Sequence, residues 1–199
     1  MSKSMSRGLL CAALITLPSV AMAHTGQSNS YGFLHGFLHP IGGLDHILAM
    51  VLVGLVAVQL GGKAIWLVPA SFLAMMAVGG AAGLTSFPVP FVEVGIAMSV
   101  IVLGAVVGLN LAAPTATIMG LVGFFAIFHG YAHGAEMPES AAGLAYGVGF
   151  VIATAILHLL GVASGFAVAA ASRTHGGALV RVMGASASVA GVGILAGAL

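Results

Sequence analysis

Histidine and carboxylate side chains gather in two short segments of this 199-residue sequence. The first segment, HGFLHPIGGLDH, spans residues 35–46, and the second, FHGYAHGAEMP, spans residues 128–138. Asp, Glu, Lys and Arg together make up only 5% of the chain, so these polar groups are concentrated against an apolar background. Imidazole and carboxylate ligands without thiolate suit Ni²⁺, Co²⁺, Zn²⁺ or Cu²⁺ better than Cu⁺. The two segments therefore predict a site for a divalent transition metal.

The second segment has the more regular spacing. His129 and His133 are one helical turn apart, and Glu136 follows seven residues after the first histidine. On a helix all three side chains face the same way, so the two histidines can chelate one ion. The pattern His-Gly-aromatic-x-His occurs in both segments, at residues 35–39 and 129–133. We expect a shared way of binding metal or a short internal duplication to account for this echo.

The first segment needs a bend before its histidines can meet. His39 and His46 are seven residues apart, which corresponds to about 10 Å along a straight helix. We expect Pro40 to push His39 out of helical geometry and the Gly42-Gly43 pair to let the chain fold back. Asp45, beside His46, can serve either as a metal ligand or as an acceptor that fixes the imidazole tautomer.

Apolar stretches long enough to cross a bilayer as helices make up most of the remaining chain. Six of them are separated by turn signals, at about 41–60, 64–84, 90–111, 114–133, 141–171 and 178–198. The chain is 60% hydrophobic with a mean hydropathy of +1.19, outside the range of soluble domains. The sequence therefore predicts an all-α membrane protein with a single six-helix transmembrane domain over residues 24–199. The fifth stretch is long, so it should tilt or bend near Gly161.

The N-terminal 23 residues have the features of a cleavable signal peptide. Two basic residues precede an apolar run, and Ala21-Met22-Ala23 offers a small-residue cleavage site. Cleavage would leave His24 at the N-terminus, where its amine and imidazole either form a bidentate chelator or belong to an unstructured end. Cys11, the single cysteine, lies inside this signal, so the mature chain would have no thiol for a disulfide or a thiolate metal site.

An exported N-terminus followed by six spans places both termini in the periplasm. Lys63, Arg173 and Arg181 then fall in or beside cytoplasmic loops, while Glu136 and Glu139 fall outside, as the positive-inside rule expects. With this topology the polar side chains converge on the periplasmic face. The converging residues are His35, His39, Asp45, His46, Glu93, His129, His133 and Glu136.

Glu93 and two further histidines can be explained without a bound metal. Glu93 is a candidate ligand or a side chain that reaches to the membrane interface. His158 lies well inside the fifth stretch, where it either assists the passage of an ion or is a packing histidine. His175 is expected in a solvated loop.

The segments HPIGGLDH (39–46) and FHGYAHGAEMP (128–138) resemble the two signature segments of the HupE/UreJ family, bacterial membrane proteins regarded as nickel permeases for hydrogenase or urease maturation. The resemblance extends over essentially the whole chain. It implies a secondary transporter of the bacterial inner membrane, not an enzyme, without a tightly bound cofactor. A cobalt or copper permease of the same architecture is the alternative that the resemblance leaves open. The residues on which transport should depend are His39, Asp45, His46, His129, His133 and Glu136.

The residues leave two other functions open and argue against two kinds of ligand. An intramembrane zinc-dependent hydrolase would use three histidines and a water activated by Glu136 or Glu93, and a metal sensor would bind without transport. There is no P-loop for ATP. Without the signal, three basic and four acidic residues give a formal charge of 3 − 4 = −1, and no basic patch suits nucleic acid. The predicted partners are a divalent metal ion and the lipid bilayer, with a homo-oligomer left open.

Overall fold

The computed structural model describes residues 29–85, 88–137, 141–172 and 174–199. These residues are all-helical and contain no strand. The helices are α2 (Asn29–Gly42), α3 (Leu44–Leu60), α4 (Ala64–Gly83), α5 (Val92–Gly108), α6 (Thr115–Ala135), α7 (Ala141–Ala171) and α8 (Gly176–Leu195). The predicted signal peptide with Cys11, His24, Glu139 and Arg173 lie outside the described residues.

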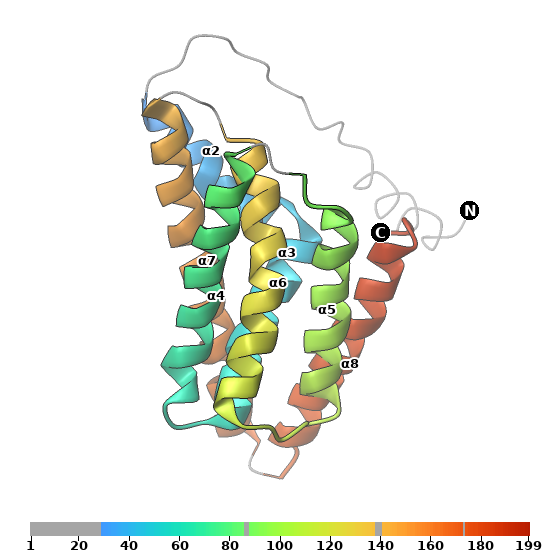
Figure 1. Cartoon of the computed structure of the whole chain (residues 1–199). Helices are drawn as coiled ribbons and strands as arrows, with labels where there is room; N and C mark the ends of the chain where they lie inside the picture. Colours follow the sequence, from blue (N-terminus) through green and yellow to red (C-terminus); the bar gives the residue numbers. More distant parts are fainter. Residues whose placement is uncertain (1–28, 86–87, 138–140, 173) are drawn as a thin grey trace, which may run out of the picture.

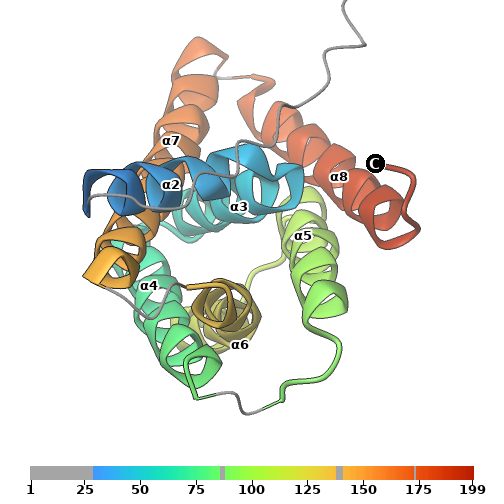
Figure 2. The same ribbon diagram turned by 90° about the horizontal axis from the view of Figure 1, so that it is seen from above.

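Six of the helices, α3 to α8, run along one common direction as a bundle (Figure 1). α3 contacts α4, α5, α6, α7 and α8, so it is the central helix. Around it, α4 packs along α6, α5 packs along α8, and α7 packs against both α2 and α3. Figure 2 looks down on the end that carries α2 and shows α2 running across this end. We call this the α2 end of the bundle.

Glycines allow the paired helices to approach each other closely. A Cβ atom at Gly130 of α6 would meet the backbone carbonyl of Met76 on α4, and one at Gly36 of α2 would meet the carbonyl of Tyr146 on α7. Gly104 of α5 lies in the same way against the backbone of α8. Such small-residue contacts are how helices associate where no water is available to drive their association.

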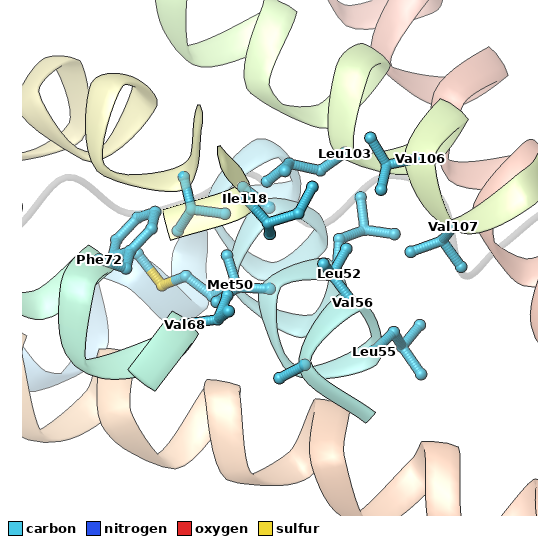
Figure 3. Packing of buried hydrophobic residues seen from close by; sticks show 14 of the residues in the cluster. Met50, Leu52, Leu55, Val56, Val68, Phe72, Leu103, Val106, Val107 and Ile118 are labelled. Atoms are coloured by element: carbon cyan, nitrogen blue, oxygen red, sulfur yellow. The ribbon is translucent and has the colours of Figure 1, made fainter. Parts of the chain in front are cut away.

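The apolar core lies between α3 and its neighbours. Figure 3 shows side chains from α3, α4, α5 and α6 filling this space, including Met50, Phe72 and Leu103, each fully buried. Large apolar side chains are also exposed on the outside of the bundle, among them Trp66 and Leu144. A protein that is apolar both inside and outside suits a lipid environment.

Four helices are long and apolar enough to cross a membrane on their own: α4, α6, α7 over 142–171, and α8. α2 and α3 meet this criterion together as one span bent by 80°. α5 has 17 residues and is shorter than the predicted span 90–111, because the chain turns at Phe91 and Asn110, which both have positive φ. The third predicted span, 90–111, is therefore represented by a shorter apolar helix, and up to five of the six predicted spans are long and apolar enough among the described residues.

The predicted fold-back at Gly42-Gly43 is present, since α2 ends at Gly42 and α3 begins at Leu44. The expectation that Pro40 would push His39 out of helical geometry was wrong, because α2 contains both residues. Pro40 stands in the last turn of α2, where it removes the hydrogen bond to residue 36 and no further turns have to be built. Proline is therefore tolerated, and the direction changes at the glycines.

The long fifth stretch forms a single helix. α7 has 31 residues and continues as a helix through Gly161. Its length of about 46 Å exceeds the hydrocarbon thickness of about 30 Å. Tilting or extending beyond the bilayer is the way such a helix is accommodated.

Candidate metal site

Four histidines from three helices meet near the α2 end of the bundle. The ring centroid of His133 lies 4.7 Å from that of His39 and 4.7 Å from that of His46. The centroid of His129 is 5.0 Å from that of His46. The break after Gly42 brings α2 and α3 to α6 in this way. We call His39, His46, His129 and His133 the histidine cluster.

A direct hydrogen bond joins the two histidines at its centre. The Nε2 atoms of His46 and His133 are 2.6 Å apart, so one of them carries a hydrogen and the other accepts it. Asp45 Oδ1 lies 2.8 Å from Nδ1 of His46 and also accepts the backbone N–H of His46. If Asp45 accepts the Nδ1–H of His46, Nε2 of His46 keeps a free lone pair and His133 is the donor. The structure thus favours Asp45 as the residue that fixes the tautomer.

Ser99 of α5 holds the most deeply buried member of the cluster. Its hydroxyl donates to the carbonyl of Ile96 at 2.6 Å, which leaves its oxygen to accept the Nε2–H of His129 at 3.0 Å. Nδ1 of His129 then carries a lone pair, and it has no hydrogen-bond partner among the described residues. The sequence analysis missed Ser99, although a serine inside an apolar helix was a usable signal.

The exposed side of the cluster comes close to the dimensions of a metal site. Ligand atoms of His39, His133 and Glu136 lie within 4.8 Å of one another, and His39 Nε2 is 3.7 Å from Glu136 Oε2. An ion with ligands at 2.0–2.2 Å needs separations of about 3 to 4 Å, so a small inward movement would complete the site. The Glu136 side chain is 63% exposed and that of His39 is 32% exposed, so an ion can reach them from water.

An open depression of about 420 Å³ leads to the cluster. It is lined by residues of α2, the break and α3, namely His35, Leu38, His39, Gly42, Gly43, Asp45 and His46. His35 is exposed at its rim, and its ring centroid is 5.9 Å from that of His39. The depression gives the cluster a mouth at the α2 end.

The remaining candidates lie apart from the cluster. Glu93 is exposed in the first turn of α5, and no contact within the described part of the chain joins it to the histidines. Its place suits the positive end of the helix dipole. His175 is an exposed residue at the start of α8, in agreement with its expected loop position. His158 is buried in α7.

The amino-acid sequence of this chain is similar to that of known proteins. The model of a protein family described as "HupE / UreJ protein" matches residues 12–194. The chain is 43% identical over 185 residues to "Protein HupE" of Rhizobium leguminosarum bv. viciae, which covers 93% of this chain and 95% of that protein. No solved structure matches the chain.

Proposed function

Because the chain belongs to the HupE/UreJ family, we propose that it is a permease for a divalent transition metal, with nickel as the first candidate. The observation that carries this proposal is the histidine cluster at one end of a bundle of apolar helices. The ion would come from the periplasm and supply the maturation of hydrogenase or urease. Cobalt, copper and zinc are the competing cargoes, because the same imidazole ligands accept them.

Capture would begin at the exposed ligands. His39 and Glu136 stand closest to water and would take the ion first, with His133 as the third ligand. His133 also contacts His46, so the ion can exchange ligands without leaving the cluster. The hydrogen shared between the two Nε2 atoms would be released when both bind metal.

A hydrolase fits this arrangement less well. Catalytic zinc keeps one open position for water and needs a carboxylate placed to activate that water. Glu136 is largely exposed at the mouth, and Asp45 is engaged by His46. A row of neighbouring imidazoles that begins at the half-buried His39 and ends at the fully buried His129 suits the transfer of an ion.

We further propose that the protein lies in the bacterial inner membrane with both termini in the periplasm. The α2 end would face the periplasm, and the turn at Lys63 would face the cytoplasm. Reporter fusions after Lys63 and Arg173 should then give a cytoplasmic signal, and fusions near Glu139 a periplasmic one. The reversed pattern would contradict uptake from the periplasm.

Uptake of radioactive nickel tests the function directly. Cells or vesicles containing the protein should take up nickel faster than those without it, and His133→Ala should abolish the difference at unchanged protein level. His175→Ala, which removes an exposed histidine outside the cluster, should behave like the unaltered protein. Competition by cobalt, zinc and copper would rank the cargoes. Loss of uptake only through loss of protein would assign the histidines to packing.

A further inference from the structure

Two buried polar side chains of α7 have no partner to satisfy them. Both ring nitrogens of His158 and the hydroxyl of Thr154 make no hydrogen bond within the described residues. His158 is 1% exposed and Thr154 is fully buried. Residues four apart on a helix lie on the same face, so the two side chains point into the same region. Buried polar groups are normally paired, and unpaired ones call for a ligand, an ion or a water molecule.

This pair lies deeper in the bundle than the histidine cluster. Gly54 of α3 packs against the carbonyl of His158. Gly54 is eight residues beyond His46, which corresponds to about 12 Å along α3. α7 begins at the α2 end, because Gly36 of α2 packs against Tyr146 in its first turns. Since helical side chains lean toward the N-terminus of their helix, the His158 ring leans back toward the cluster.

Phe72 of α4 lies next to both groups of histidines. Its ring centroid is 5.0 Å from that of His158 and 5.5 Å from that of His129. His129 also has an unpaired nitrogen, Nδ1. The series from the mouth inward is therefore continuous: His39, His133, His46, His129, then Phe72 and His158.

We propose that His158 and Thr154 form a second cation site, which receives a divalent transition metal from His129 past the ring of Phe72. The site rests on the proposed function as a permease. Imidazole nitrogen is a direct ligand for such ions, and the threonine hydroxyl would bind the ion or one of its remaining water molecules. The residues beyond are apolar core, where an ion without ligands is strongly disfavoured. The imidazole of His158 at this depth would lower the free-energy barrier for an ion that leaves the histidine cluster.

The metal site and a buried structural water make different predictions for a polar replacement. Asparagine can hydrogen-bond to water but is a poor ligand for nickel, so His158→Asn separates the two. Thr154→Val removes the hydroxyl with little change of shape and provides an independent variant. The matched controls are His175→Asn and Thr117→Val, which alter an exposed histidine and an exposed helical threonine.

The experiment combines nickel titration of purified protein with initial uptake rates in vesicles. The unaltered protein should bind a second, weaker equivalent of nickel that His158→Asn lacks, while the tighter equivalent keeps its affinity. Uptake at saturating nickel should fall about 10-fold or more in His158→Asn and by a smaller factor in Thr154→Val, with KM little changed. Neither control should show these effects.

Two results would overturn the second site. Normal uptake and normal stoichiometry in His158→Asn would identify a water-bound or packing histidine. A loss of the tight equivalent as large as in His133→Ala would place His158 in the first site. Failure of the proposed function is distinguishable, because the unaltered protein would then show no uptake above empty vesicles, whatever the number of nickel equivalents it binds.

Discussion

Replacing Asp45 by asparagine tests how the cluster is prepared for metal. The carboxylate accepts the Nδ1–H of His46 at 2.8 Å, which directs the free lone pair of Nε2 toward His133. A neutral amide oxygen is a weaker acceptor. The amide NH₂ can also donate to Nδ1, which would move the ring hydrogen to Nε2 and block the position where metal would bind.

The contact between Asp45 and His46 determines how much nickel affinity the substitution should cost. Loss of a carboxylate that orients a metal-binding histidine typically weakens metal affinity about 10- to 100-fold, or about 1.4 to 2.8 kcal/mol. A hydrogen bond to a charged group contributes about 1.5 to 3 kcal/mol, which agrees. Because the Asp45 side chain is 23% exposed, water can replace part of the interaction. We therefore expect Asp45→Asn to weaken nickel binding about 10- to 30-fold.

Calorimetric titration of nickel into the purified protein measures this directly. His175→Ala should keep the original affinity, and the thermal unfolding midpoint of each variant without metal reports whether its fold is intact. An unchanged affinity in Asp45→Asn would refute the argument from the tautomer. Complete loss of binding in a folded variant would make Asp45 a metal ligand itself.

Three further predictions follow from the same contacts. Ser99→Ala should weaken nickel binding about 10-fold in calorimetry, because it leaves the Nε2–H of His129 without its acceptor; an unchanged affinity would remove Ser99 from the site. Gly130→Ala should destabilise the protein by about 1 to 3 kcal/mol in a denaturation assay, since the new Cβ meets the carbonyl of Met76. Gly120→Ala on the same helix has nothing within 4 Å and should not destabilise; equal behaviour of the two would contradict this packing. Nickel uptake in vesicles should fall as the outside pH is lowered from about 7.5 to about 5.5, because protons compete for imidazole; a rise would indicate proton-driven transport.

Much of the fold and the meeting of the two segments could be predicted from the sequence. Apolar length determines which stretches can be helices in a bilayer, and that information is local. The glycine pair at 42–43 stood between two histidines that a straight helix would keep apart, so the bend followed from residue types and spacing. The grouping of His46 with His133 needed only the order of the helices and their alternating directions.

What could not be predicted depends on contacts between helices. Pro40 was read as a helix breaker, but its effect depends on how many turns follow it, and α2 ends two residues later. The partnership of Ser99 with His129 requires the relative rotation of α5 and α6. Glu93 shares the α2 end with the cluster by topology, yet its side chain is exposed in the first turn of α5. This could not be predicted, because nothing in the sequence determines how α5 is rotated about its axis.

The repeated His-Gly-aromatic-x-His pattern also places a glycine at a contact between helices. In each copy the glycine lies against the backbone of a neighbouring helix, Gly36 against α7 and Gly130 against α4. The two histidines of a copy stand one residue before and three residues after this glycine, so both lie about 60 to 100° to the same side of the contact. The backbone contact thus fixes the direction of both imidazoles. The pattern therefore combines candidate metal ligands with helix packing, and the position of these histidines depends on a glycine that has no side chain to bind an ion.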